Sequence, residues 1–182
     1  ASKGMIEQPT LATERLVLRP FTLADADDVQ RLAGAAEIAD TTLNIPHPYA
    51  DGMAEAWIES HAHAFRNRER VVLAVTDSSV LVGAISLRLD FEHARAELGY
   101  WIGLPFWGRG YATEAAVAMV GYGFNELGLN RIFAHHVARN PASGRVMEKA
   151  GFTHEGFHRA HVLKNGRFED LHSFAILRAD QG

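Results

Sequence analysis

The segment PFWGRGYATEA, at residues 105–115, places Gly108 and Gly110 around Arg109 just before an alanine-rich run. A glycine turn that leads into a helix leaves the free N–H groups of the first helical turn pointing outward. The helix dipole favours negative charge there, and the absent side chains let an anion come close to the backbone. The segment therefore predicts a phosphate-binding loop, although the same pattern also suits a tight strand-to-helix connection that binds nothing.

This loop differs from two common nucleotide-binding signatures. No lysine followed by serine or threonine comes after the glycines, which disfavours the P-loop of ATPases and GTPases. Thr113 stands where the dinucleotide-binding fingerprint needs a third glycine. The chain also has no cysteine, so an acyl group cannot pass through a cysteine thioester on the protein.

The overall charge and the histidine spacing exclude further classes of protein. A net charge of −4 argues against a duplex nucleic-acid binder, which needs a basic face. His61 and His63 would point in different directions on a helix, and His135 and His136 would face opposite sides of a strand. The apolar run at residues 115–124 is shorter than the ~20 residues of a membrane span. We therefore expect a cytoplasmic protein that uses neither a metal nor a membrane.

The 182 residues, of which 47% are hydrophobic and 22% charged, have the composition of one folded domain. We expect residues 1–9 to form an N-terminal tail, beginning with a remnant of expression before Met5, and residues 10–178 to form the domain. The first residues lack the apolar run of a signal peptide.

Hydrophobic periodicity predicts a mixed α/β fold. Strands are expected at 13–21, 70–76, 80–90, 94–103 and 130–138, helices at 22–34, 51–68, 111–127 and 141–149, and a hairpin at 151–177 that turns at Asn165-Gly166. The strand at 94–103, the helix that follows the glycine loop and the strand at 130–138 should form a right-handed βαβ unit with parallel strands.

The motifs ELGYWIG, PFWGRGYATEA, NPAS and MEKAGF occur in this order, and together they resemble the GNAT family of N-acetyltransferases. The segments LATERLVLRPF, RIFAHHVARNPASGRVMEKAGF and NGRFEDLHSFAIL look like its RimJ/RimL-type branch, which acetylates ribosomal-protein N-termini and other amines. The similarity extends from Thr10 to Leu177. It implies a mixed central sheet with a parallel βαβ core flanked by helices, acetyl-CoA as co-substrate, and a homodimer.

The resemblance also implies which residues bind acetyl-CoA. The pyrophosphate would lie on the loop formed by Trp107, Gly108, Arg109, Gly110, Tyr111, Ala112 and Thr113, where Trp107 replaces the usual glutamine or arginine. The backbone of Tyr100, Trp101 and Ile102 would pair with the pantetheine arm and polarise the acetyl carbonyl. Asn140 would hydrogen-bond the same arm and Ser143 would lie near the thioester sulfur, while Asn140 and Pro141 also suit a helix start.

The attacking amine must be neutral, so a base is expected among the carboxylates Glu97, Glu155 and Asp170. Glu97 shares a strand face with Gly99 and Trp101, and it resembles the family glutamate that acts through a water. Asp170 looks like an acid of the RimJ/RimL branch. We predict catalytic roles for Ser143, Glu97 and Asp170, and the sequence leaves open which carboxylate is the base.

The leading interpretation is an acetyl-CoA-dependent N-acetyltransferase in which a primary amine attacks the thioester directly in a ternary complex. The acceptor is a protein N-terminus or a small amine such as an amino acid, polyamine or antibiotic. The segment at 41–52 is expected to form part of the acceptor wall. A CoA-binding sensor without catalysis is the alternative, which the presence of Asn140, Ser143 and several carboxylates disfavours.

Overall fold

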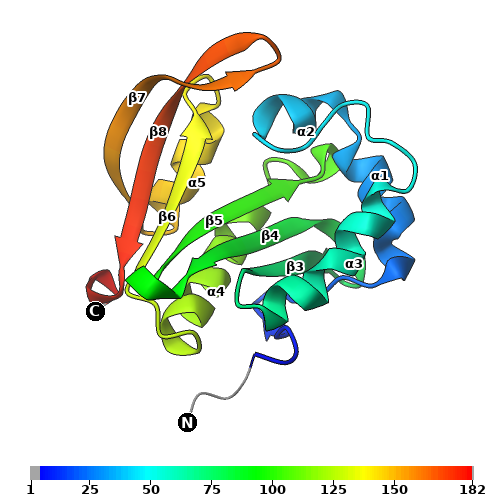
Figure 1. Cartoon of the computed structure of the whole chain (residues 1–182), viewed down its shortest axis with the longest axis horizontal. Coiled ribbons are helices and arrows are strands. Elements are labelled where there is room, and N and C mark those ends of the chain that lie inside the picture. Colours follow the sequence, from blue (N-terminus) through cyan, green and yellow to red (C-terminus); the bar gives the residue numbers. More distant parts are fainter. Residues whose placement is uncertain (1–4, 182) are drawn as a thin grey trace.

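Eight strands form one mixed sheet in the computed structural model, which describes residues 5–181 (Figure 1). Across the sheet the strands follow the order β1-β2-β3-β4-β5-β6-β8-β7. Their bounds are β1 Leu11–Ala12, β2 Leu16–Pro20, β3 Arg70–Asp77, β4 Val80–Asp90, β5 Arg95–Ile102, β6 Arg131–Val137, β7 Thr153–Lys164 and β8 Arg167–Leu177. The α/β class predicted from the periodicity is confirmed.

The helices cover both faces of this sheet. They are α1 Ala26–Ala33, α2 Ala36–Thr41, α3 Met53–Arg66, α4 Tyr111–Asn125 and α5 Pro141–Lys149. In Figure 1, α1 and α3 lie over one face of the central strands, and α4 and α5 lie behind the sheet. Among residues 5–181, no helix combines the length and the apolar character that crossing a bilayer demands.

The N-terminal segment that was expected to be a tail contacts the domain in part. Residues 1–4, which hold the expected remnant of expression, lie outside the described residues. Met5 packs against the buried core. The Gln8 side chain accepts a hydrogen bond from the backbone N–H of Val72 at 2.7 Å.

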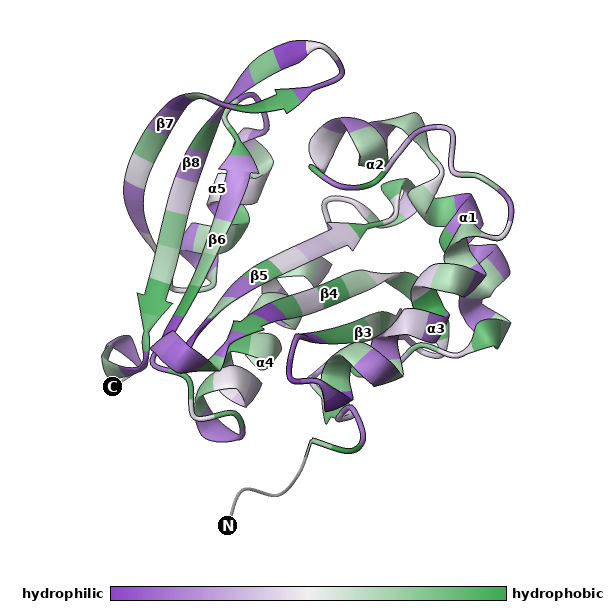
Figure 2. Ribbon diagram, in the orientation of Figure 1, coloured by the Kyte–Doolittle hydropathy of each residue, from purple (hydrophilic) through white to green (hydrophobic). Residues whose placement is uncertain are grey.

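Two hydrophobic clusters form the core, one on each side of the central strands, because successive side chains of a strand point to opposite faces. On β5, Leu98 and Ile102 belong to the cluster that includes α4, whereas Trp101 belongs to the cluster that includes α1 and α3. Figure 2 shows hydrophobic residues along β3 and β4, while the β7–β8 hairpin mixes hydrophilic and hydrophobic residues. Several hydrophobic side chains of the hairpin are exposed, among them Phe157, Leu163 and Phe168.

Two local features differ from the sequence prediction. The strand expected at 13–21 is confined to Leu16–Pro20, and the two-residue strand β1 before it was not predicted. In the turn between them, Leu16 N donates to Thr13 Oγ1 at 2.9 Å. The six-residue helix α2 was not predicted, because fewer than two helical turns do not produce a recognisable 3.6-residue period.

The strands β5 and β6 pair only at one end. Their parallel pairing, predicted from the βαβ unit, is confirmed and consists of Arg95 with Arg131, Ala96 with Ile132 and Glu97 with Phe133. Beyond Glu97, β5 keeps its partners on β4 but has none on β6. The two strands therefore diverge and leave a gap in the sheet.

A buried histidine on α3 should make the stability of the fold depend on pH. His61 is only 3% exposed, its ring lies 4.4 Å from that of Trp57, and neither of its ring nitrogens finds a hydrogen-bond partner among residues 5–181. Burial, aided by the charge of Arg70, lowers the pKa of His61 from 6.5 to about 4. The unfolded chain therefore binds more protons than the folded chain between these two pH values, so the stability from this group is complete above pH 6.5 and falls as pH decreases toward 4.

Between pH 7 and pH 4, we expect His61 to cost the wild type about 3 kcal/mol of its free energy of unfolding. The variant His61→Leu should not lose this amount. Urea denaturation of both proteins at a series of pH values measures this change. The variant His63→Leu, at an exposed position of the same helix, should lose as much stability in acid as the wild type. Parallel stability curves for wild type and His61→Leu would contradict the prediction.

Candidate active site

The predicted phosphate loop has the backbone that only glycine adopts without strain. Gly108 and Gly110 have φ angles of +75° and +78°, and Gly110 is the N-cap of α4. Apart from its chain neighbours, no residue in the described range 5–181 has an atom within 4 Å of the position that a Cβ on Gly108 would take. No side chain in this range caps the N-terminus of α4, so the first N–H groups of this helix are free to bind an anion.

Arg15, which the sequence analysis did not identify, braces this loop from the turn between β1 and β2. Its guanidinium donates to the carbonyl of Arg109 at 2.9 Å and to Glu114 at 2.8 Å, and it lies over the ring of Tyr111 at 4.7 Å. Thr13 also donates to Glu114, at 2.5 Å. Arg15 therefore adds a second cation to the loop that Arg109 occupies.

Trp107, at the position where the family usually has glutamine or arginine, fastens the loop to the end of β5. Its indole Nε1 donates to the carbonyl of Ile102 at 2.6 Å, while the side chain remains 44% exposed. A contact between Trp107 and the cofactor stays a prediction. The geometry assigns this residue a role in positioning the strand end.

Ser143 and Asn140 lie together at the start of α5, on the side of the sheet where Tyr100 points. Asn140 Nδ2 donates to Ser143 Oγ at 3.1 Å. Burial raises the pKa of Tyr100, and the neighbouring Ser143 hydroxyl partly offsets this rise. The hydroxyl of Tyr100 is buried and makes no hydrogen bond of ordinary geometry to residues 5–181. The three side chains therefore form a polar cluster beside the gap between β5 and β6.

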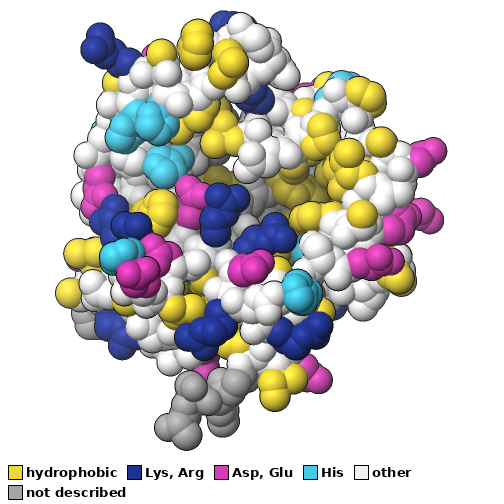
Figure 3. Space-filling model, viewed as in Figure 1, with side chains coloured by type: hydrophobic (Ala, Val, Ile, Leu, Met, Phe, Trp, Pro, Cys, Tyr) yellow, Lys and Arg dark blue, Asp and Glu magenta, His cyan; other side chains and the backbone are white. Residues whose placement is uncertain are grey.

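A cavity of about 400 Å³ occupies this gap and continues toward α3. Its lining includes Glu97, Tyr100, Trp101 and Ser143, together with many residues of the segment at 41–52, such as Leu43, Asn44, Ile45, Pro46 and Tyr49. Figure 3 shows the molecule hollowed at the centre of this face, with hydrophobic side chains on one side of the hollow and charged side chains and histidines on the other. The structure therefore brings Ser143, Glu97 and the expected acceptor wall to one site.

Glu97 forms a hydrogen bond with His135 inside this cavity. Glu97 Oε2 lies 2.9 Å from His135 Nδ1, and this contact, against the effect of burial, lowers the pKa of Glu97. The sequence predicted only that His135 and His136 face opposite sides of their strand. That prediction is confirmed, because the two side chains have different partners. His135 bonds to Glu97, whereas the ring of His136 stacks on Phe174 at 5.6 Å. The pair itself was missed, since 38 residues separate its members.

The other two candidate carboxylates do not line the cavity. Asp170 Oδ1 accepts a hydrogen bond from Ala160 N at 2.6 Å, where Ala160 has a φ of +47° in a bulge of β7. Glu155 pairs with Arg131 at 2.5 Å. A catalytic role for Asp170 stays a prediction, and its observed contact stabilises the bulged backbone.

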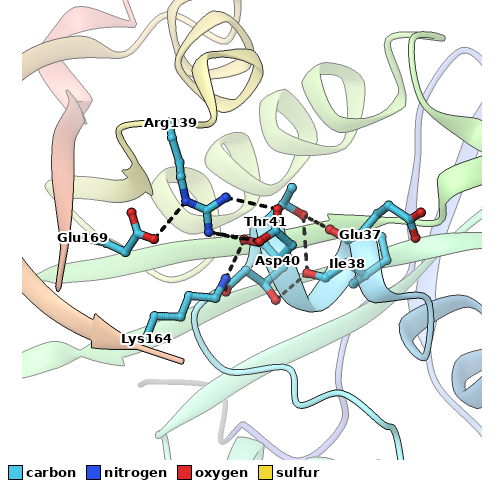
Figure 4. Close-up of polar contacts among 8 residues, drawn as sticks. Glu37, Ile38, Asp40, Thr41, Arg139, Lys164 and Glu169 are labelled. Carbon is cyan, nitrogen blue, oxygen red and sulfur yellow. Dashed lines mark hydrogen bonds and ion pairs between the residues drawn. The ribbon is translucent and has the colours of Figure 1, made fainter. Parts of the chain in front are cut away.

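Arg139 ties α2 to the C-terminal hairpin above the cavity (Figure 4). Its guanidinium nitrogens lie 3.1 Å from both carboxylate oxygens of Asp40 and 2.9 Å from Glu169. Lys164 donates to the carbonyls of Asp40, at 2.6 Å, and of Thr42. The hydrogen bonds from the Arg139 guanidinium lower the pKa of the Asp40 carboxyl. Figure 1 shows the hairpin tip leaning toward α2 as a result. We call Asp40, Arg139, Lys164 and Glu169 the roof clamp.

The roof clamp anchors the beginning of the segment at 41–52 because α2 ends at Thr41. Arg139 also directly precedes Asn140, the N-cap of α5. The clamp therefore connects the acceptor wall to the residues expected to contact the cofactor.

Comparison with known proteins identifies relatives along most of the chain. The model of the acetyltransferase (GNAT) domain matches residues 15–153. "Uncharacterized N-acetyltransferase p20" of Bacillus licheniformis is 32% identical over 94% of this chain and 97% of its own length. "Putative ribosomal N-acetyltransferase YdaF" of Bacillus subtilis is 33% identical over 72% of each chain. A spermidine N(1)-acetyltransferase of Vibrio cholerae is 25% identical over 91% of this chain and 94% of its own.

Solved structures show the same fold. The acetyltransferase (GNAT family) from Bacillus anthracis superposes with a TM-score of 0.84 at 26% identity, covering 96% of this chain and 100% of that one. Mycobacterium smegmatis RimJ in complex with CoA-disulfide superposes with a TM-score of 0.86 over 94% of this chain and 88% of that one. Its identity of 20% supports likeness of fold alone.

The roof clamp combines a buried and an exposed ion pair, so its members should differ in their effect on stability. The Glu169 side chain is 9% exposed, whereas that of Asp40 is 58% exposed. Arg139→Leu would leave the Glu169 carboxylate buried without its cation, and we expect it to destabilise the fold by about 3 kcal/mol. Asp40→Asn should cost less than about 1 kcal/mol.

Urea denaturation at pH 7 measures both changes. Arg31→Leu is the control, because Arg31 pairs with Asp28 on the exposed surface of α1 and its loss should have little effect. An Arg139→Leu variant no less stable than Arg31→Leu would contradict the assignment of Glu169 as a buried partner.

Proposed function

The chain belongs to the GNAT family and is an acetyl-CoA-dependent N-acetyltransferase, and we propose that its acceptor is the α-amino group of a peptide or protein N-terminus. The set of charged side chains that line the cavity supports this proposal. Among residues 5–181 these are Arg70, Arg88 and Glu97. Glu97, the one carboxylate of this set, already bonds to His135.

This set of charges favours an acceptor with a single positive group. A polyamine carries several cations, and the two arginines would repel those that Glu97 does not neutralise. An N-terminal α-amino group is followed by peptide carbonyls, which accept hydrogen bonds from guanidinium groups. The apolar part of the lining, which includes Leu43, Met53 and Trp57, suits the side chain of the first residue.

The names of the relatives include both kinds of acceptor, a ribosomal N-acetyltransferase and a spermidine N(1)-acetyltransferase. The cavity supports the first kind. An α-amino group also has a pKa of about 7.7–8.0, lower than that of a lysine or polyamine, so less free energy is needed to produce the neutral nucleophile.

The residues of the glycine loop fit acetyl-CoA, since the open backbone at Gly108 and the N-terminus of α4 can hold its pyrophosphate. Acetyl-CoA supplies the thioester that the amine attacks. We propose that free N–H groups along the diverging part of β5 stabilise the oxyanion of the tetrahedral intermediate. Ser143, held by Asn140, donates a hydrogen bond to the sulfur as the thiolate leaves.

A panel of amines tests the acceptor proposal. Thiol release from acetyl-CoA would be followed with short peptides that have a free N-terminus, with the same peptides blocked at the N-terminus but carrying a lysine, and with spermidine. We expect kcat/KM for the free N-terminus to exceed that for spermidine by at least about tenfold, which corresponds to 1.4 kcal/mol. A preference for spermidine would overturn the proposal.

Substitution of Ser143 tests its role in thiolate departure. Ser143→Ala should lower kcat by roughly ten- to a thousandfold, because the lost hydrogen bond strengthens only as charge develops on sulfur. The KM for acetyl-CoA should change little for the same reason. Steady-state kinetics and a denaturation curve measure the two effects. A variant that loses stability but keeps its kcat would show that Ser143 only supports the start of α5.

A further inference from the structure

The pair formed by Glu97 and His135 lies where the sheet divides. Glu97 is the last residue of β5 that pairs with β6, and His135 lies two positions beyond its partner Phe133. Both side chains line the cavity, and both are partly exposed to it, at 32% for Glu97 and 28% for His135. An acceptor bound in this cavity would therefore lie beside a wall that includes this pair.

The hydrogen bond fixes which nitrogen of His135 carries a proton. An ionised carboxylate only accepts hydrogen bonds, and the contact with His135 keeps the pKa of Glu97 low. Nδ1 must therefore be the donor in the 2.9 Å contact. In the neutral imidazole Nε2 then holds the lone pair, and it has no hydrogen-bond partner among the described part of the chain.

A carboxylate with a lowered pKa is a weak base toward an ammonium group, whereas imidazole titrates near the pH at which proteins operate. Glu97 also already uses a carboxylate oxygen in its hydrogen bond with His135, which it would have to exchange for another partner in order to act on the amine itself. These properties suit Glu97 to orienting the imidazole and His135 to accepting a proton.

We propose that His135 is the general base of the acetyl transfer and that Glu97 is the positioning residue that fixes its tautomer. As the amine nitrogen forms its bond to the acetyl carbon, one proton moves from that nitrogen to His135 Nε2. The C–S bond then breaks, its electron pair remains on sulfur, and the thiolate takes a proton from solvent near Ser143. His135 returns its proton to water, so the sum is amine plus acetyl-CoA giving amide plus CoA.

This assignment rests on the acetyl transfer stated above, but it does not require the acceptor to be a peptide. It differs from the prediction that Glu97 itself acts as the base through a water. The sequence could not distinguish the two, because nothing in the spacing of Glu97 and His135 shows that they meet.

Other charged and titratable groups surround His135. Arg88 on β4 lies opposite Glu97 in the strand register and contributes to the lowered pKa of Glu97. The ring of His158 on β7 lies 6.4 Å from that of His135. Arg131 lies over Phe133, whose ring contacts His135, and it is paired with Glu155. Arg70 lines the same cavity.

Kinetics as a function of pH test the assignment. With whichever amine the wild type acetylates, His135→Gln should lower kcat by about 10²- to 10⁴-fold and remove the acid limb of the pH profile of kcat/KM. The KM for acetyl-CoA should stay within about threefold, because Nε2 acts on the amine. His158→Gln is the matched control, a neighbouring histidine outside the cavity lining, and should keep both the rate and the acid limb.

A spectroscopic measurement tests the tautomer without any acceptor. In the full chain with ¹⁵N-labelled histidine, long-range ¹H–¹⁵N spectra at pH 8 should show His135 protonated on Nδ1. Glu97→Gln should change this tautomer and lower kcat, whereas His158→Gln should leave it as in the wild type. Protonation of His135 on Nε2 in the wild type, or a His135→Gln variant with an intact acid limb, would overturn the proposal. A preference for spermidine in the amine panel would affect only the acceptor assignment.

Discussion

The early end of the pairing between β5 and β6 is the constraint on which the site depends. Backbone N–H and C=O groups that face a gap inside a protein cost free energy unless something pairs with them. Here the exposed edge begins just after Glu97 and Phe133, at the centre of the molecule rather than at the margin of the sheet. A bound extended arm can supply the missing partners, so under the proposed mechanism the same divergence that weakens the sheet would give the pantetheine chain a place to pair and would provide an oxyanion site.

Two polar networks hold this gap between segments that are far apart in the chain. Beside the start of α4, Arg15 joins the first strands to Glu114 and the glycine loop. At the acceptor end, Arg139 joins α2 to Glu169 and the hairpin. Each arginine donates several hydrogen bonds at once, which fixes both the distance and the relative orientation of the segments that it joins. The walls of the cavity thus come from both halves of the chain, and neither half forms the site alone.

The sequence predicted those parts of the fold and site whose signals are local. The glycine loop, the Asn140-Pro141 helix start and the hairpin at Asn165-Gly166 each lie within a few residues, and the parallel β5–β6 unit follows from the handedness rule. Contacts between distant residues could not be predicted, and these include Arg15 with Glu114, Asp40 with Arg139, and Glu97 with His135. The hydrogen bond from Ala160 N to Asp170 could not be predicted either, and the catalytic role that the family resemblance implies for Asp170 stays a prediction.

Residues from both faces of the sheet line the cavity, so in the proposed reaction the two substrates would approach from opposite faces. Tyr100 and Ser143 lie toward α4 and α5, whereas Trp101 lies toward α1 and α3 on the face that Glu97 shares. In the proposed binding mode, acetyl-CoA would enter beside the start of α4 and the amine would enter under the roof clamp. Neither molecule would then have to pass the other, and each product could depart along the route by which its precursor arrived. Such an arrangement would impose no order of binding, and a slow-leaving product would obstruct one entrance while the other stays open.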